Sequence, residues 1–557
     1  MVATELLQVA DADADCQNRS GTRFRAVIEG DRLRMDALMS AQTLPLLVTQ
    51  MLEPEFYPHP VKPPIRLVQT HISYVFLTGD IAYKIKKAVD FGFLDFSTVE
   101  RRKHFCHEEL RMNREIAPDI YLNVVAIACK GDRYALDSDG EIVEYAVRMR
   151  QFPQSALLSN LFARGALTDD HLETLGHVVA AFHAGTATND HIRSFGSADK
   201  IGEAIGDNYR YTQKYVGGLQ TQQQFEETQQ FTDAFLGERS LFAERQSQHR
   251  IRECHGDLHL KNICFWRGAI HLFDRIEFNE SFRFVDVMYD VAFTVMDLDG
   301  RDRPDLGNVF LNTYLERSGD WDGVRVLPLY LCRQAYVRAK VNSFVFEESE
   351  IDASDRREAA AAAGRYYHLA WQYAQPRSGN LILTCGLSGS GKSTVARAIA
   401  RRINAIHLRS DAVRKHLAGV PLERHGTEAL YVPHVTQRTY RRLLNLGLAL
   451  AERGFPVILD ARYARQEHRR EAIAAAAARG LPLQILHCTA PVNVLRDRLQ
   501  SRRGDVSDAT PQLLTSQQAS SEPFAGSECQ YVIEVDTTRE WQSHLEDFCP
   551  GQTRTVP

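Results

Sequence analysis

A polar stretch between two apolar segments, CHGDLHLKNICF (Cys254 to Phe265), holds residue types that could transfer a phosphoryl group. Asp257 and Asn262 stand five residues apart, and Asp274 follows the apolar run AIHLF. Transfer of a phosphoryl group to a hydroxyl needs a base near the acceptor oxygen and two oxygen ligands for Mg²⁺. An Asp, an Asn and a second Asp in this order supply those groups.

A second loop, GLSGSGKS, fits the phosphate-binding pattern G-x-x-x-x-G-K-[ST]. An apolar strand precedes it and the amphipathic segment TVARAIARRI follows it, as the mechanism requires. The glycines allow backbone N–H groups to turn toward phosphate oxygens. Lys392 is expected to reach the β- and γ-phosphates and to act in catalysis, while Ser393 binds Mg²⁺. The ATP-binding residues predicted in this loop are Gly386, Ser388, Gly389, Ser390, Gly391, Lys392, Ser393 and Thr394.

Residues after the next two expected strands complete this second site. Asp411, in RSDAVRKHL, can accept the proton of a substrate hydroxyl, and Arg414 can hold an anionic substrate. Asp460 ends the strand VILDA and is placed to bind Mg²⁺. Arg498 and Arg502 precede a polar loop that could close over the triphosphate as a lid, although arginines there also suit a solvated helix face.

The elements that position these residues differ between the two halves of the chain. Five short apolar strands beyond residue 380 alternate with helical text, which predicts a doubly wound parallel sheet. In the first half, residues 65–88 predict two or three antiparallel strands with a turn at Gly79-Asp80, before a long helix that ends at Pro118 and further strands to about residue 152. The Pro-rich PEFYPHPVKPP predicts an extended linker, and residues 153–373 are mainly helical.

The C-terminal motifs resemble the small P-loop kinases of the gluconate kinase, adenylyl-sulfate kinase and zeta-toxin type. The resemblance covers about residues 380 to 540. It rests on the P-loop, the segment from Ser410 to Arg414, Asp460 and the pair Arg498 and Arg502. It implies transfer of a phosphoryl group from ATP. Members of these families phosphorylate different acceptors, so the resemblance indicates the type of reaction far better than the identity of the acceptor.

The stretch HGDLHLKN resembles the catalytic loop of the aminoglycoside and choline phosphotransferases, which have a protein-kinase-like fold. The resemblance implies that Asp257 is the base, that Asn262 and Asp274 bind the metal, and that Asp286 or Asp290 stabilises the loop. No Gly-x-Gly-x-x-Gly motif precedes the expected lysine strand, and RIEF replaces the Phe-Gly that follows the metal aspartate in protein kinases.

The same resemblance requires a lysine for the α- and β-phosphates and a glutamate to pair with it. In IAYKIKKAV, strand alternation places Lys84 and Lys86 on one face, and the resemblance favours Lys84. On the following helix Glu108 and Glu109 compete. Glu109 is favoured because its helical stripe includes buried-type residues three and four positions away.

Together these features predict a multidomain α+β and α/β protein. The expected parts are a partly disordered extension (1–42), a kinase-like N-lobe (43–152), a helical C-lobe (153–375) and a P-loop kinase domain (376–557). ATP and Mg²⁺ are the expected cofactors and small molecules the expected acceptors.

The composition is that of a water-soluble protein with no expected membrane segment. The net charge of −5 and the absence of a Lys/Arg-aromatic tract argue against a nucleic-acid partner. Scattered cysteines and the lack of a signal peptide favour the cytoplasm. Two alternatives stay open: one nucleotide site could regulate the other, or the chain could phosphorylate nucleic-acid ends.

Overall fold

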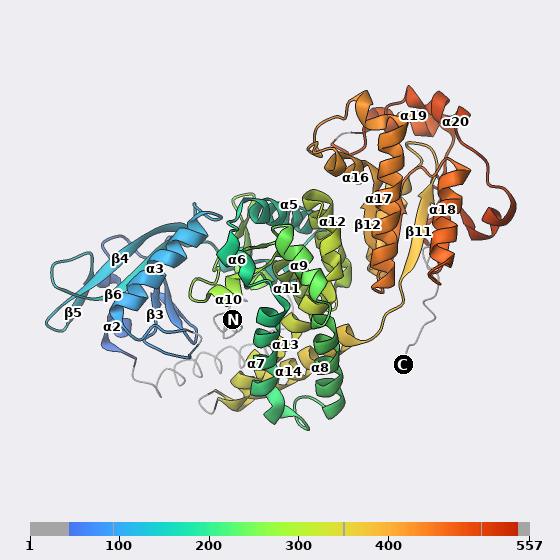
Figure 1. Cartoon of the computed structure of the whole chain (residues 1–557). Helices are drawn as coiled ribbons and strands as arrows, with labels where there is room; N and C mark the ends of the chain where they lie inside the picture. The colour runs from blue at the N-terminus through green and yellow to red at the C-terminus, as the bar shows by residue number, and fades with distance from the viewer. Residues whose placement is uncertain (1–43, 93, 349–350, 503, 544–557) are drawn as a thin grey trace, which may run out of the picture. The chain divides into compact units, whose positions relative to one another are not determined.

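The computed structural model describes residues 44–92, 94–348, 351–502 and 504–543 (Figure 1). The extension predicted for residues 1–42 lies outside this range. Contacts group the chain into two units: the first comprises residues up to Leu161 together with Lys261–Arg283, and the second comprises Phe162–Leu260 and the rest of the chain from Phe284. The domain boundaries predicted from the sequence remain predictions.

The described strands of residues 66–150 form one antiparallel sheet of six strands in the first unit, in the order β1-β2-β3-β6-β4-β5. The predicted turn at Gly79-Asp80 joins β2 to β3. The strands are β1 (Arg66–Gln69), β2 (Ser73–Leu77), β3 (Ile81–Lys86), β4 (Tyr121–Lys130), β5 (Arg133–Leu136) and β6 (Glu141–Arg150).

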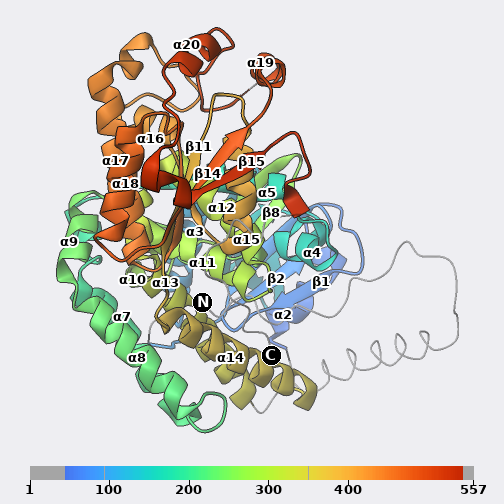
Figure 2. The same cartoon turned by 90° about the vertical axis from the view of Figure 1, so that its right-hand side faces the viewer.

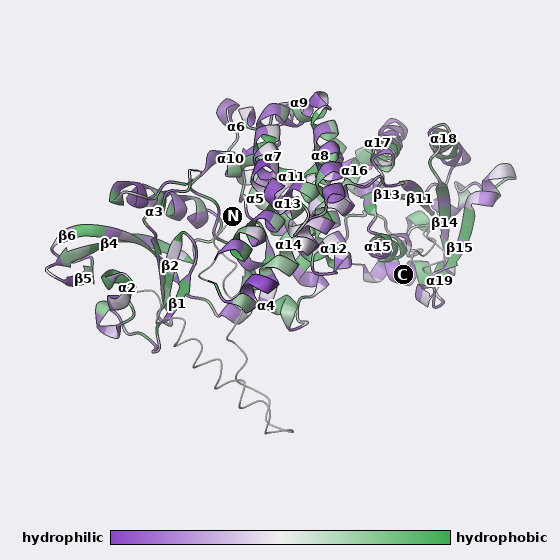
Figure 3. Cartoon of the chain, turned by 90° about the horizontal axis from the view of Figure 1, so that it is seen from below, coloured by the Kyte–Doolittle hydropathy of each residue, from purple (hydrophilic) through white to green (hydrophobic). Residues whose placement is uncertain are grey.

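Helices and a hairpin complete the first unit. Helix α3 (Val99–Arg114) is mostly hydrophilic (purple in Figure 3), yet its buried side chains include polar and charged ones beside Cys106 and Met112. The segment predicted as an extended linker instead packs into the core, because Phe56 and Tyr57 are buried beside β3. The remaining elements are α2 (Leu46–Gln50), η1 (Pro54–Phe56), η2 (Gln154–Ala156), α4 (Leu158–Ala163, which continues into the second unit), β8 (Ile263–Trp266), β9 (Ala269–Leu272) and α10 (Glu280–Arg283).

The second unit begins with helices, as predicted for residues 153–373. Helix α11 is buried on all sides and packs against α13. The elements are α5 (Asp169–Gly185), α6 (Asp190–Ser194), α7 (Ala198–Thr212), η3 (Gln213–Tyr215), α8 (Gln222–Leu236), α9 (Arg239–Ser247), β7 (Ile251–Glu253), η4 (Leu260–Asn262, which crosses into the first unit), β10 (Phe284–Asp286), α11 (Val287–Asp299), α12 (Pro304–Ser318), η5 (Trp321–Arg325), α13 (Leu327–Glu347) and α14 (Ala353–Ala374).

The C-terminal part of this unit is a parallel sheet, and the predicted doubly wound fold is confirmed. In the described range its five strands have the order β12-β13-β11-β14-β15. Helix α15 covers one face, where Ile382 and Ile458 pack against it, and α17 covers the other, where Gly447 approaches Leu381 and Leu459 (Figure 2).

The bounds of these elements follow the predicted alternation of strands and helices. They are β11 (Asn380–Cys385), α15 (Lys392–Ile403), β12 (Ile406–Arg409), α16 (Ser410–Leu417), η6 (Glu428–Tyr431), α17 (Pro433–Glu452), β13 (Pro456–Asp460), α18 (Gln466–Ala477), β14 (Leu483–Thr489), α19 (Val492–Ser501), α20 (Leu513–Ala519), η7 (Gly526–Tyr531) and β15 (Val532–Asp536). Within the described residues, no helix combines the length and the apolar composition needed to cross a bilayer.

Candidate active sites

The first candidate site gathers around the buried carboxylate of Glu109 in the first unit. Glu109 is fully buried, and its two oxygens contact Lys84 Nζ at 2.9 Å and Lys86 Nζ at 2.8 Å. Lys84 also contacts Asp274 Oδ1 at 2.5 Å, and Lys86 contacts Glu277. The structure therefore brings together Lys84, Glu109 and Asp274, as the sequence predicted, and adds Lys86 and Glu277.

These charges stabilise one another despite their burial. Burial alone would raise the pKa of Glu109, but Lys84 and Lys86 hold it below its ordinary value. Burial would lower the pKa of Lys84, yet Asp274 and Glu109 keep it above its ordinary value. For Glu277 burial dominates and raises the pKa. Lys84 and Glu109 are thus an ionised pair at neutral pH.

Two oxygen-bearing side chains lie at the open end of the hairpin β8–β9. The hairpin pairs Ile263 with Leu272, so Asn262 and Asp274 emerge from the same end of it. The Asp274 N–H donates to the Tyr121 hydroxyl at 3.1 Å, and its backbone has a φ of 63°, a left-handed value that a residue other than Gly seldom adopts. Amide and carboxylate oxygens are the ligand types that Mg²⁺ prefers.

Asp257 belongs to the second unit, where the surrounding loop is fixed by hydrogen bonds. Asp290 accepts the N–H groups of His255 at 2.7 Å and Gly256 at 2.9 Å, and His255 Nδ1 accepts the Asp257 N–H at 3.3 Å. Asp297 accepts the Leu260 N–H at 3.0 Å. Burial works to raise the pKa of Asp257, but charges that include His259 lower it below its ordinary value.

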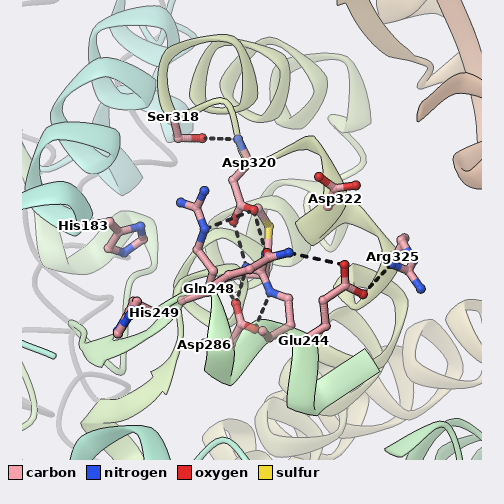
Figure 4. A network of polar contacts seen from close by, with 12 residues as sticks. His183, Glu244, Gln248, His249, Asp286, Ser318, Asp320, Asp322 and Arg325 are labelled. Atoms are coloured by element: carbon pink, nitrogen blue, oxygen red, sulfur yellow. Dashed lines mark hydrogen bonds and ion pairs between the residues drawn. The ribbon is translucent and has the colours of Figure 1, made fainter. Parts of the chain in front are cut away.

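Of the two aspartates left open from the sequence, Asp290 is the one that holds the loop. Asp286 instead caps helix α11, accepting the Met288 N–H at 2.9 Å, and forms a bidentate ion pair with Arg245. Arg245 is 2% exposed and also contacts Asp320 at 2.6 Å. Asp286 and Asp320 belong to one network of polar contacts (Figure 4). Asp286 therefore anchors the helix that carries Asp290.

The second candidate site is the loop between β11 and α15. Gly389 and Gly391 have φ values of 80° and 86°, and helix α15 begins at Lys392, so backbone N–H groups at its N-terminus are available to an anion. Lys392 Nζ donates to the Leu387 carbonyl at 2.8 Å. Burial lowers the pKa of Lys392. Ser388 is held by Gln517, which accepts its N–H at 3.0 Å and which the sequence did not predict.

Asp460 lies beside this loop, as the parallel pairing of β11 with β13 requires. It accepts hydrogen bonds from the hydroxyls of Thr384, at 3.0 Å, and Ser393, and it contacts His407 Nε2 at 3.0 Å. Burial works to raise the pKa of Asp460, but His407 and Arg409 outweigh it and hold that pKa well below its ordinary value. The structure thus brings Ser393 and Asp460 together, and His407 is an addition.

The predicted acceptor residues lie on helix α16. Asp411 is half-buried at its first turn. Arg414 is buried and donates to the Leu430 carbonyl at 2.9 Å and the Thr436 hydroxyl at 3.2 Å, so its guanidinium also holds the segment in front of α17. The ring of Tyr431 lies 4.8 Å from that guanidinium.

The two arginines predicted to belong to a lid have different surroundings. Arg498 donates to the Gly389 carbonyl at 3.3 Å and to the Thr537 hydroxyl at 2.8 Å, which places it directly against the phosphate-binding loop. Arg502 follows the last turn of α19, where its charge helps to lower the pKa of Asp505.

Comparison with known proteins agrees with this organisation. Residues 381–524 match the family described as an AAA domain, a range that contains the loop, α16, Asp460 and Arg498. The protein Rv2004c of Mycobacterium tuberculosis and Mb2027c of Mycobacterium bovis, both called uncharacterized, are each 31% identical over 462 residues, which is 82% of this chain and 90% of theirs. The chain belongs to the Rv2004c family. The family match confirms the P-loop domain predicted for the C-terminal part.

Three solved structures align with part of this chain. A choline/ethanolamine kinase family protein from Mesorhizobium loti aligns with 59% of this chain and 99% of its own, at 10% identity and a TM-score of 0.34. A gluconokinase from Sinorhizobium meliloti covers 31% of this chain and 91% of its own, at 21% identity and a TM-score of 0.23. The Mycobacterium tuberculosis APS kinase CysC covers 31% and 96%, at 22% identity and a TM-score of 0.23.

Proposed function

We propose that this member of the Rv2004c family is an ATP-dependent phosphotransferase with two nucleotide sites. Each site transfers the γ-phosphate of Mg-ATP to a hydroxyl group of a small-molecule acceptor. One observation carries the proposal: two separate sets of residues each combine a lysine for phosphate with at least one carboxylate suited to Mg²⁺. These are Lys84 with Glu109 and Asp274, and Lys392 with Asp460.

In the kinase-like part, Glu109 orients Lys84 toward the phosphates of ATP, and Asn262 and Asp274 offer oxygen ligands to the metal. Mg²⁺, when bound, neutralises the charge that develops on the transferred phosphoryl group. Asp257 is the acceptor-side base. Its lowered pKa keeps the carboxylate ionised at neutral pH, so that it can orient the acceptor hydroxyl and take its proton during transfer.

In the P-loop part, the backbone of residues 386–391 and Lys392 hold the phosphates, and Ser393 and Asp460 are suited to the metal. Asp411 is the proposed base, Arg414 contributes positive charge on the acceptor side, and Arg498 completes the surroundings of the nucleotide. The contact of Arg498 with the Gly389 carbonyl supports that role.

Nucleotide stoichiometry tests the proposal. Calorimetric titration of the full chain with a non-hydrolysable Mg-ATP analogue should give two sites, and Lys84→Met and Lys392→Met should each give one. Arg397→Met, an exposed charge on the same helix as Lys392, serves as the control and should retain both sites. A wild-type count of one site would refute the two-site assignment.

A second candidate, in which one site regulates the other, is favoured by helix α12. Tyr314 on this helix contacts His183 Nδ1 at 3.0 Å, and His183 in turn contacts Asp290, which holds the Asp257 loop. On the same helix, Asn312 accepts the His407 N–H at 2.8 Å. One helix therefore contacts the supports of both sites. If it couples them, saturating the P-loop with ADP should change the ATP affinity of the other site, and Asn312→Ala should weaken that effect.

A further inference from the structure

Helix α13 carries two positive side chains, Arg333 buried and Lys340 half-buried, that form no ion pair with any carboxylate in the described part of the chain. Arg333 is 6% exposed, and its Nε has no hydrogen-bond partner. The guanidinium carbon lies 4.8 Å from the centroid of the Tyr289 ring. Lys340 Nζ donates to the neutral amide oxygen of Asn208 at 2.5 Å. Buried charges are ordinarily paired, because burial without a counter-charge is unfavourable.

The spacing of the two cations aggravates this cost. Positions 333 and 340 are seven residues apart, which is two helical turns, so the two side chains share one side of α13. Burial and the charge of Arg333 together lower the pKa of Lys340 to about 8. Two like charges on one side of a helix, one buried and one half-buried, are destabilising in themselves. Such an arrangement is expected where an anion binds and supplies the missing charge.

The charged stretch of α13 packs against helix α11, whose aspartates hold the loop that carries the proposed base. Gln334 donates to the Tyr289 carbonyl at 3.3 Å, so α13 packs directly on helix α11 at this point. Burial raises the pKa of Tyr289, and the charges acting on that hydroxyl include both Arg333 and Asp257. Arg338, between the two cations, contributes to lowering the pKa of Asp257. Arg333 therefore acts on the same hydroxyl as Asp257, and Arg338 acts on Asp257 itself.

We propose that Arg333 and Lys340 form an anion-binding subsite for the acceptor of the kinase-like part. The acceptor would then be an alcohol that also carries a carboxylate or a phosphate group. A guanidinium and an ammonium group suit either anion, since both offer several N–H donors to the anionic oxygens. This inference rests on the proposed function only for the role of Asp257 as base; the binding of the anion is independent of turnover.

The test measures anion binding by the full chain in the absence of ATP. All chains carry Lys392→Ala, because the P-loop would itself bind phosphate. Thermal stability is followed during titration with inorganic phosphate in one arm and acetate in the other. We expect the anion to stabilise the parent chain, and we expect Arg333→Met to lower the apparent anion affinity by roughly tenfold or more. The arm that responds identifies the phosphate or the carboxylate class.

Two further variants keep the test decisive. Arg210→Met removes an exposed charge from α7, the helix that carries Asn208, and should leave anion binding unchanged. Arg333→Lys keeps the charge but loses the guanidinium geometry and should give intermediate affinity. Arg333→Met should itself be at least as stable as its parent without anion, since it removes an unpaired buried charge, so weakened binding cannot be ascribed to misfolding. Equal anion stabilisation of the Arg333→Met and Arg210→Met chains would overturn the proposal.

Discussion

Replacement of Glu109 by Gln tests the buried charge cluster of the first unit. Glu109 contacts two lysine ammonium groups, at 2.9 and 2.8 Å, and is fully buried. At an effective dielectric constant of about 20, each contact corresponds to roughly 6 kcal/mol of attraction, most of which offsets the loss of hydration. Breaking a buried pair from one side typically costs about 3–5 kcal/mol. Because each lysine keeps a second carboxylate partner, we expect a loss near the lower limit, about 3 kcal/mol.

Glu108 supplies the matched control on the same helix. It contacts Arg111 at 2.9 Å on the surface, and an exposed pair of this kind contributes about 1 kcal/mol or less. Glu108→Gln should therefore change little, in line with the sequence pattern that favours Glu109 over Glu108.

The assay is hydrogen exchange of the amides in β3 and α3, which reports opening of this unit without requiring the whole chain to unfold in one step. Glu109→Gln should speed exchange by roughly a hundredfold, which is what about 3 kcal/mol implies, and should also weaken ATP binding. Because the folded pKa of Glu109 lies below its ordinary value of 4.5, its stabilisation is complete above that pH and is lost as pH falls through the folded pKa. Equal exchange in the two variants, or faster exchange in Glu108→Gln, would refute the reasoning.

Three other outcomes follow from the site geometry. Asp460→Asn should lower acceptor phosphorylation by the P-loop site by at least about a hundredfold while nucleotide still binds without Mg²⁺, as measured by calorimetry with and without the metal. Asp290→Asn leaves one oxygen to accept the N–H groups of His255 and Gly256, so exchange of those amides should rise by a factor corresponding to about 2 kcal/mol; unchanged protection would contradict their assignment. Anion affinity at the α13 subsite should fall as pH rises through about 8, because Lys340 loses its proton there, and a Lys340→Met chain should show no such step in a pH series of titrations.

The sequence predicted best what depends on local pattern. The P-loop, its flanking strand and helix, and the five parallel strands all follow from motif and periodicity. The helical stripe likewise distinguished Glu109 from Glu108, because burial on α3 repeats with the helical period. The sequence pattern separated Lys84 from Lys86 less clearly, because strand alternation places both on one face and Glu109 contacts both.

The supporting residues escaped prediction because they act across long sequence separations. His407 supports Asp460 from the neighbouring strand, 53 residues away, and Gln517 supports Ser388 from 129 residues away. Only His407 left a signal in the sequence, as a polar residue inside the buried strand β12. Arg333 and Lys340 could not be singled out from the sequence, because only the folded chain shows that neither forms an ion pair with a carboxylate among the described residues.

Initial rates of ATP consumption test the central claim most directly. They should be measured for the full chain, Asp257→Ala, Lys392→Ala and the double variant, with a pool of small metabolites as acceptors. Two working sites predict that each single variant retains part of the wild-type rate and that the double variant retains none above background. If either single variant already matches the double variant, only one site turns over and the claim of two phosphotransfer sites is wrong.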